Sequence, residues 1–337
     1  MFFISFNFID LILSEAKKIL IIRLSSLGDV LLTTPIIRSL KKSYPQLSID
    51  FLIKKNFADA VRLNPNVSNT IIYNDSPNLL SELANNNYDL MIDLHNNFRS
   101  QKIVRQLRIP SFKFVKPNLK KFLLVHFKIN MLKEIKSIPE RYTEVIPDFK
   151  LDGAGLELFI PDSMKSELEG FKNVIGICPG AFHFAKRWPI EYYAEFGNRL
   201  VKNGFKVAIF GGELDKSICA NLQKMIPDSI DLSNNNELFQ TAAHMKNCKV
   251  VLCNDSGLMH TATAVGIPVI SLFGSTVKEF GFAPYGVNNL VIENSNLNCR
   301  PCTHIGRSKC PKNHFKCMTE ITPNSVYDRF IKFMDNK

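Results

Sequence analysis

The segment Asn254–His260 places a carboxylate, a hydroxyl and a glycine where a predicted strand passes into a predicted helix. The apolar run Lys249–Cys253 before it is typical of a buried strand, and the small residues Thr261–Gly266 after it are typical of a helix that ends at a glycine. Asp255 or Ser256 can cap this helix. Because the first N–H groups of a helix have no partner within it, the junction predicts a phosphate site, with an ordinary capped helix as the alternative.

Three further polar side chains follow predicted strands. Asp29 follows the first strand of the chain, whereas Lys186 and Glu213 follow strands of its second half. One half thus offers a carboxylate, and the other offers a cation, a second carboxylate and a helix start. This arrangement suits an activated phosphate ester in the second half that is attacked by a group oriented in the first. The turn Gly28-Asp29 lacks the GxGxxG spacing, so the nicotinamide-binding fingerprint is absent.

The elements that must position these residues alternate between strands and helices. The apolar run Lys18–Leu24 is typical of a parallel strand covered on both faces, and Val30–Lys42 has the period of a helix, with Pro35 in its first turns. This order predicts βαβ units and a parallel sheet. Further strands are predicted at Ser48–Ile53, Thr70–Tyr73 and Tyr88–Leu94.

A second series of the same kind follows a break between Phe149 and Lys172, which is rich in Pro and Gly. We therefore predict an α/β protein of two Rossmann-like domains that face a central cleft, residues 1–160 and 161–337, with ligands at the carboxyl ends of the strands. The strands of the second series are predicted at Asn173–Cys178, Lys206–Phe210, Ser229–Leu232, Lys249–Cys253 and Pro268–Phe273. Its helices are predicted at Ile190–Asn203, Lys216–Ile226, Asn236–Asn247 and Pro323–Met334.

The composition, with 45% hydrophobic and 22% charged residues, is typical of a globular protein. No run of eighteen apolar residues occurs, so no membrane-spanning helix is predicted. The apolar stretch Met1–Leu13 is interrupted by Asp10 and has no basic start or cleavage site. We interpret it as an extension before the first strand and not as a signal peptide, with weak contact to a membrane surface as an alternative.

The net charge of +11 is concentrated in the first half. Residues 1–150 hold 22 Lys and Arg against 13 Asp and Glu, and Arg99–Arg141 alone holds 12 basic and two acidic residues. Such a basic segment predicts an anionic partner, which could be a phosphorylated lipid, a membrane surface or a nucleic acid. A solvated basic face without a partner is the alternative.

The eight cysteines, without a secretion signal, indicate a reducing environment. Four are scattered, at Cys178, Cys219, Cys248 and Cys253. The other four form a cluster, interleaved with His304 and His314, whose spacing could hold zinc or could consist of reduced thiols in an irregular loop. This cluster consists of Cys299, Cys302, Cys310 and Cys317.

Four segments resemble, in the same order, the motifs of the ADP-heptose:lipopolysaccharide heptosyltransferases, glycosyltransferase family nine. The resemblance runs from about Lys18 to the C-terminus and is closest to the heptosyltransferase II branch, which also carries a Cys-rich segment. The segments are Arg23-Leu24-Ser25-Ser26-Leu27-Gly28-Asp29-Val30-Leu31, Cys178-Pro179-Gly180-Ala181, Ala185-Lys186-Arg187-Trp188-Pro189 and Asn254-Asp255-Ser256-Gly257-Leu258-Met259-His260.

The resemblance implies a GT-B fold and an inverting, metal-independent transfer of heptose from ADP-heptose to the inner core of lipopolysaccharide, without a cofactor. It assigns Asp29 as the catalytic base and Lys186 as a catalytic residue that binds the diphosphate. Asp255 would hold heptose hydroxyls and Glu213 the ribose hydroxyls. Backbone groups at four further positions would complete the donor site, at Gly28, Gly180, Ser256 and Gly257.

The acceptor is expected on the N-terminal domain, where the loop after the strand Tyr88–Leu94 and the basic segment supply Asp93, Asn96, Arg99 and Arg141. The protein is accordingly expected to be a cytoplasmic monomer, peripheral to the anionic inner membrane, that binds no nucleic acid. One alternative is a related glycosyltransferase with another nucleotide sugar or acceptor. A more distant one is a nucleic-acid-binding protein, which would bind arbitrary nucleic acid with steep salt dependence.

Overall fold

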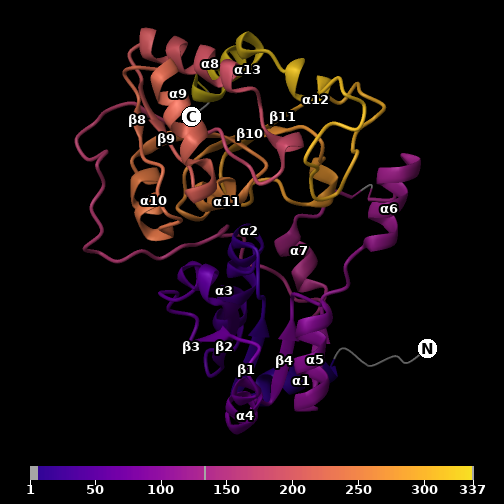
Figure 1. The fold of residues 1–337 in the computed structure, drawn as a ribbon. Coiled ribbons are helices and arrows are strands. Elements are labelled where there is room, and N and C mark those ends of the chain that lie inside the picture. Colours follow the sequence, from indigo (N-terminus) through magenta and orange to yellow (C-terminus); the bar gives the residue numbers. More distant parts are fainter. Residues whose placement is uncertain (1–6, 133, 336–337) are drawn as a thin grey trace. The chain divides into compact units, whose positions relative to one another are not determined.

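The computed structural model describes residues 7–132 and 134–335, which form two compact units (Figure 1). Unit 1 comprises residues up to Lys116 together with Ile138–Phe159, and unit 2 comprises Pro117–Ser137 and Ile160–Lys337. Each unit is built on one parallel sheet. Among the described helices, none combines the length and the apolar character that crossing a bilayer requires.

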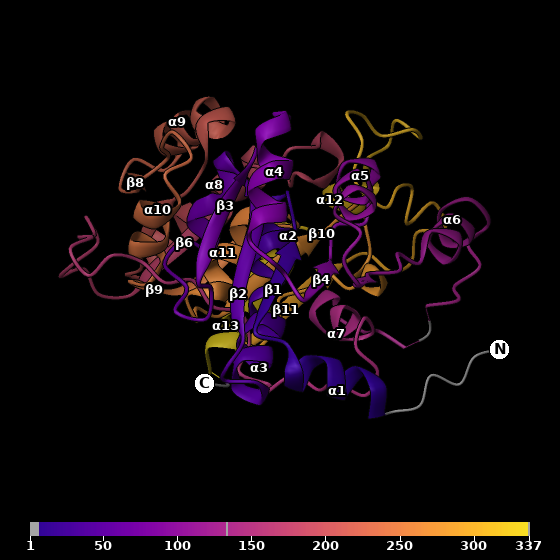
Figure 2. The same ribbon diagram turned by 90° about the horizontal axis from the view of Figure 1, so that it is seen from below.

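Unit 1 has a five-stranded sheet in the order β3-β2-β1-β4-β5, and Figure 2 lets the strands β3, β2 and β1 be followed side by side. The helices α4 and α5 cover one face, where Leu79, Leu83 and Ile103 pack on Leu20 and Met91. The elements are α1 (Asn7–Glu15), β1 (Lys18–Ile22), α2 (Leu27–Leu31), α3 (Thr34–Ser43), β2 (Ser48–Lys54), η1 (Lys55–Ala60), β3 (Asn69–Tyr73), α4 (Pro77–Asn85), β4 (Leu90–Asp93), α5 (Phe98–Leu107), β5 (Ser111–Lys113) and α7 (Ile138–Thr143).

Unit 2 has a six-stranded sheet in the order β11-β10-β9-β6-β7-β8, between two layers of helices. Because successive side chains of a strand point to opposite faces, Ile175 and Ile177 pack with α8, α9 and α13, whereas Val174 and Cys178 pack with α10 and α11. The elements are α6 (Asn118–Phe127), β6 (Val174–Cys178), η2 (Phe184–Lys186), α8 (Ile190–Lys202), β7 (Lys206–Ile209), η3 (Glu213–Asp215), α9 (Lys216–Met225), β8 (Ile230–Asp231), α10 (Leu238–Met245), β9 (Cys248–Asn254), α11 (Gly257–Ala264), β10 (Val269–Phe273), η4 (Lys278–Phe280), β11 (Asn289–Glu293), α12 (Lys316–Thr319) and α13 (Pro323–Asp335).

One sequence expectation differs from the structure in unit 1. The predicted helix Val30–Lys42 is divided into α2 and α3, because Pro35 has no N–H for the carbonyl of Leu31 and the Thr34 hydroxyl donates to that carbonyl instead, at 2.8 Å. The predicted N-terminal extension forms α1 from Asn7 onward, and its first six residues lie outside the described part of the chain.

The segment 117–137 differs from the predicted division at residue 160, because it belongs to unit 2 and not to the N-terminal domain. Its side chains Leu124, Val125 and Leu132 are buried against Val277 and Phe280 of unit 2. The basic stretch Arg99–Arg141 is therefore shared between the two units and is not one continuous segment of unit 1.

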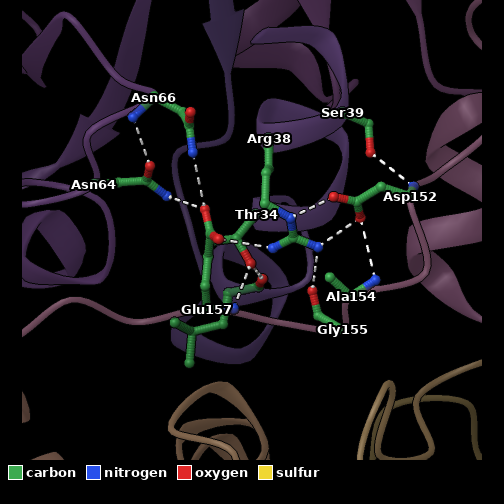
Figure 3. Close-up of polar contacts among 10 residues, drawn as sticks. Thr34, Arg38, Ser39, Asn64, Asn66, Asp152, Ala154, Gly155 and Glu157 are labelled. Carbon is green, nitrogen blue, oxygen red and sulfur yellow. Dashed lines mark hydrogen bonds and ion pairs between the residues drawn. The ribbon is translucent and has the colours of Figure 1, made fainter. Parts of the chain in front are cut away.

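The chain returns to unit 1 in residues 138–159, and one arginine holds this return (Figure 3). The guanidinium of Arg38 in α3 donates to Asp152 at 2.8 Å, to Glu157 at 2.7 Å and to the carbonyl of Gly155 at 2.8 Å. Hydrogen bonding from this guanidinium lowers the pKa of Asp152 to about 2. The interdomain segment predicted from its Pro and Gly content is thus anchored to unit 1 through its first part.

Candidate active site

Both sheets have the strand order of doubly wound folds, in which the order reverses between two neighbouring strands. The reversal lies between β1 and β4 in unit 1 and between β6 and β9 in unit 2. Ligands of such sheets bind outside the carboxyl ends of the strands at this point. The loops after these four strands carry most of the predicted site residues.

In unit 1, Asp29 lies in α2 directly after β1, and its carboxylate is held from two sides. The guanidinium of Arg23 contacts one carboxylate oxygen at 2.6 Å, and the Ser26 hydroxyl donates to the other at 2.7 Å. Arg23 is itself buried and donates to the carbonyls of Ser25 and Leu94. Arg23 thus fixes the position of the Asp29 carboxylate, while 22% of the Asp29 side chain stays exposed. Gly28 is buried beside it in α2.

The loop after β4 is organised by Asp93, which is fully buried. Its carboxylate accepts hydrogen bonds from the backbone N–H groups of His95 and Asn96 and from the Ser100 hydroxyl, at 3.0, 2.7 and 2.8 Å. Asn96 adopts the left-handed conformation with φ 41° and donates to the carbonyl of Phe114. Asp93 therefore shapes the loop, while contact of Asp93 or Asn96 with an acceptor stays a prediction.

Two predicted acceptor residues of unit 1 lie in different environments. Arg99 is exposed in the first turn of α5, whereas Arg141 in α7 is buried, and burial lowers the pKa of Arg141. His95 of the loop after β4 and Lys116 of the basic segment face the charges around Arg23. Burial, with the positive charges of Arg23 and Lys116, lowers the pKa of His95 to about 3, so its ring is neutral at pH 7.

In unit 2, Lys186 and Asp255 form an ion pair of 2.7 Å between the loop after β6 and the loop after β9. The Thr276 hydroxyl, from the loop after β10, donates to the same oxygen of Asp255 at 2.6 Å. Both charged side chains are largely buried, with 16% and 9% exposed. Lys186 is thus held at the start of α11, where cationic and N–H groups converge.

Asn254 fixes the relative position of these loops, a role that sequence reasoning did not assign. Its fully buried amide accepts from the backbone N–H of Trp188 and from the Tyr193 hydroxyl, both at 3.0 Å, and donates to the carbonyls of Pro179 and Gly180. Trp188 is also buried, and its indole N–H donates to the carbonyl of Ile321 at 2.7 Å, so this tryptophan anchors its loop.

The start of α11 offers unpaired donors. Ser256 occupies the N-cap position without a side-chain cap, and its hydroxyl is buried with no hydrogen-bond partner among the described residues. Gly257 begins the helix, so the first N–H groups have no acceptor within it. A helix start with an unsatisfied hydroxyl beside a lysine is suited to a phosphate oxygen.

Gly180 and Glu213, the other two residues of unit 2 that were predicted to bind the sugar donor, lie at the same edge of the unit 2 sheet. A Cβ atom on Gly180 would come within 2.2 Å of the Asp215 carboxylate, so the loop after β6 packs closely on η3. Glu213 is exposed after β7, where its N–H donates to Asn236 at 3.2 Å. The structure therefore brings Lys186, Asp255 and the start of α11 together, with Glu213 one strand away.

The cysteine cluster lies after β11. Cys299, Cys302 and Cys310 are half-buried, Cys317 is buried, and all eight cysteines are free thiols. The Cys299 sulfur lies 3.9 Å from Nε2 of His314. Among the described residues, no group of three or more His, Cys, Asp or Glu side chains is arranged to hold a metal ion.

Comparison with known proteins gives a family match. Residues 78–312 match the model of glycosyltransferase family 9 (heptosyltransferase). The chain is 28% identical over 296 residues to the lipooligosaccharide heptosyltransferase 2 of Haemophilus influenzae, a match that covers 78% of the chain and 85% of the relative.

Solved structures share the fold. A family 9 glycosyl transferase from Veillonella parvula superimposes with a TM-score of 0.78 at 23% identity, covering 95% of the chain and 98% of the relative. The ADP-heptose lps heptosyltransferase II of Escherichia coli has a TM-score of 0.73 at 24% identity, covering 95% and 99%. These likenesses confirm the predicted α/β class with two parallel-sheet domains of the GT-B type.

A more distant structure differs in metal content and assembly. The glycosyltransferase TibC of enterotoxigenic E. coli, iron-containing and dodecameric, has a TM-score of 0.61 at 14% identity, covering 96% of the chain and 79% of the relative. Its likeness concerns the fold alone.

Proposed function

Because the chain belongs to glycosyltransferase family 9, the heptosyltransferase family, we propose that it transfers heptose from ADP-heptose to the inner core of lipopolysaccharide. The names of its relatives support this donor and acceptor. The observation that carries the proposal for this chain is the Lys186–Asp255 pair of 2.7 Å at the start of α11, beside an unsatisfied Ser256 hydroxyl.

Unit 2 would bind the donor. Lys186 and the N–H groups of Ser256 and Gly257 would contact the diphosphate, and they would stabilise the negative charge that develops on it as the sugar leaves. Asp255 would then release Lys186 in part and accept hydrogen bonds from heptose hydroxyls. Glu213, exposed one strand away, would accept from the ribose hydroxyls. The packing of Gly180 on Asp215 would keep the loop after β6 close to the phosphates.

Unit 1 would bind the acceptor and supply the base. Asp29 would take the proton of the attacking hydroxyl, with Arg23 holding the carboxylate in place, in an inverting displacement that needs no metal ion. Asn96, Arg99 and Arg141 would surround the acceptor, and Asp93 would act through the loop that it shapes. The enzyme would work as a cytoplasmic monomer at the anionic surface of the inner membrane.

Mass spectrometry of the products from ADP-heptose and a series of truncated lipopolysaccharide acceptors tests the proposal. We expect the mass of one heptose to be added to an inner-core acceptor. Parallel reactions with UDP- and GDP-sugars serve as the control. Transfer from one of these donors, and none from ADP-heptose, would instead identify a glycosyltransferase with another donor.

A further inference from the structure

A basic pocket lies in unit 2 between the end of α6 and the segment that follows β11. Its volume is about 670 Å³, which lies within the range of small-molecule sites. None of the described residues that line it is an Asp or a Glu. Its cationic and imidazole side chains are those of His126, Lys128, Arg307, Lys312, His314 and Lys316.

The sequence around the pocket is also free of acids. Between Glu293 and Glu320 there are five Lys and Arg and two His residues, and no Asp or Glu. Arg300 and Lys316 form ion pairs with the flanking Glu293 and Glu320, at 2.8 and 3.5 Å. The other positive charges of the segment repel one another, and a bound anion relieves that repulsion. Arg307 and Lys312 are exposed, so an anion can reach them from solvent.

The walls of the pocket are fixed by hydrogen bonds to backbone carbonyls. The Lys128 ammonium, at the end of α6, donates to the carbonyls of Val125, Cys299 and Pro301, at 2.9, 3.2 and 2.6 Å. Lys128 thus joins α6 to the cysteine-rich segment. The pocket is therefore formed before any ligand binds, so the binding free energy is not reduced by a cost of ordering this wall.

The loop after β10, which contains Ser275 and Thr276, connects the pocket with the proposed donor site. The Thr276 hydroxyl donates to Asp255, and the Thr276 carbonyl accepts from the Arg300 guanidinium at 2.8 Å. The N–H of Cys302 donates to the carbonyl of Ser275 at 3.2 Å. Because β10 pairs with both β9 and β11, the donor site and the pocket are built on neighbouring strands of one sheet.

Exposed apolar side chains are frequent in residues 119–135, the segment whose Val125, His126 and Lys128 line the pocket. Six of them have 50 to 70% of their surface exposed, in a segment that also carries exposed lysines such as Lys120. Apolar and cationic side chains in alternation suit the boundary between lipid headgroups and acyl chains. They favour an anion that is carried on a lipid over a free one. The six are Leu119, Phe122, Phe127, Ile129, Met131 and Ile135.

We propose that this pocket binds a phosphate group of the lipid-borne saccharide acceptor, so that unit 2 holds the acceptor as well as the donor. The proposal rests on the proposed function for the identity of the acceptor. The planar guanidinium of Arg307 can donate two parallel hydrogen bonds to a phosphate, and Lys312 adds a point charge.

Transfer kinetics of the double variant Arg307→Gln/Lys312→Gln test the proposal, with one acceptor used before and after phosphatase treatment. The KM for the phosphorylated acceptor should rise about tenfold or more, the effect of losing charged hydrogen bonds. The KM for the dephosphorylated acceptor, the KM for ADP-heptose and kcat should stay unchanged. Lys202→Gln/Lys224→Gln, which removes two exposed cations from α8 and α9, is the matched control. Equal rises for both acceptors, or no rise, would overturn the proposal.

A binding measurement separates this proposal from the proposed function. Protein saturated with ADP, which occupies the donor site, is titrated with phosphorylated acceptor in detergent and, separately, with phosphatidylglycerol vesicles. The proposal expects the variant to lose affinity for the acceptor. Loss of vesicle binding alone would assign the pocket to a bilayer headgroup and overturn it. If the wild type transfers no heptose, the proposed function fails, and this titration still decides the pocket. Lys312→Gln alone serves if the double variant is unstable.

Discussion

At the residue scale, two acids of the candidate site, Asp29 and Asp255, are each paired with a cation. Asp29 lies 2.6 Å from Arg23, and Asp255 lies 2.7 Å from Lys186. The two pairs differ in what they leave available. Arg23 is bound to two carbonyls as well and serves as a fixed support, whereas a diphosphate can compete with Asp255 for Lys186.

Replacement of Asp29 by Asn should leave ADP-heptose binding intact and lower kcat by about a hundredfold or more, the usual contribution of a positioned general base. Steady-state kinetics and calorimetry measure the two quantities. Ser26→Ala, which removes only the hydroxyl bound to Asp29, is the matched control and should lower kcat far less. Near-normal turnover of Asp29→Asn would falsify the assignment of Asp29 as the base.

Replacement of Lys186 by Ala should weaken ADP binding by roughly tenfold or more and leave adenosine binding unchanged, because only ADP carries the charge that Lys186 would contact. Calorimetry with both ligands measures this. Lys216→Ala, an exposed lysine at the start of α9, is the control. Equal losses for ADP and adenosine would show that Lys186 does not contact the phosphates.

The residues of the site could be predicted in part, because polar side chains after apolar runs must lie at the carboxyl edge of a parallel sheet. Lys186 and Asp255 were found in this way. Their partner Thr276 was not, since it lies on a third strand loop and nothing in its local sequence marks it. Pairings such as Arg23 with Asp29 depend on side-chain direction, which spacing does not determine.

At the element scale, the loop after β4 carries a neutral histidine in a positively charged environment. The ring of His95 faces the charges of Arg23 and Lys116, with Asp29 as the one nearby acid that favours protonation, and its buried Nδ1 has no hydrogen-bond partner among the described residues. The unfolded chain takes up a proton at this histidine near pH 6.5, whereas the folded protein does so only near pH 3. The contribution of neutral His95 to the free energy of unfolding is therefore fully present above pH 6.5 and is lost as the pH falls toward 3.

Urea unfolding at pH 7 and pH 5 tests this. His95 should make the wild type about 2 kcal/mol less stable at pH 5 than at pH 7, and His95→Gln should remove that part of the pH dependence. The difference between the two proteins isolates His95 from the other histidines. The same pH dependence in both proteins would mean that His95 does not carry this penalty.

Most strands could be predicted, because both sheets are covered on two faces and their strands are continuous apolar runs. The short β5 and the edge strand β11 were missed. β11 is only partly buried and carries polar residues at both ends, so it lacks the apolar signal of a central strand. The buried side chains around α6 could not be predicted, because they are few and lie among many basic residues that are typical of an exposed segment.

At the scale of the whole molecule, the proposed chemistry uses the charge of the chain in place of a metal ion. In this proposal, Lys186 and the start of α11 would take the place that a divalent cation has in many nucleotide-sugar enzymes. The cysteine cluster lies at another strand, after β11, and a metal ion bound there would contribute to folding.

Transfer activity should therefore survive excess EDTA. Activity and circular dichroism are followed together after the chelator is added. Loss of turnover with an intact fold would mean that the reaction needs a metal ion. Slow loss of folded protein would instead reveal a structural metal at the cysteines. The control is the double variant Cys299→Ser/Cys302→Ser, because it cannot lose a metal held by these two thiols.

The division of the chain between the units has a consequence for synthesis on the ribosome. Leu124, Val125 and Leu132 belong to unit 2, but their partners Val277 and Phe280 are made much later. Val277 follows Leu132 by about 145 residues, so at roughly 5–20 residues per second these apolar side chains wait about 7–30 s for their cover. Unit 1 closes during that wait, when residues 138–159 emerge. The nascent chain therefore presents an uncovered apolar and basic segment until Val277 and Phe280 have been made.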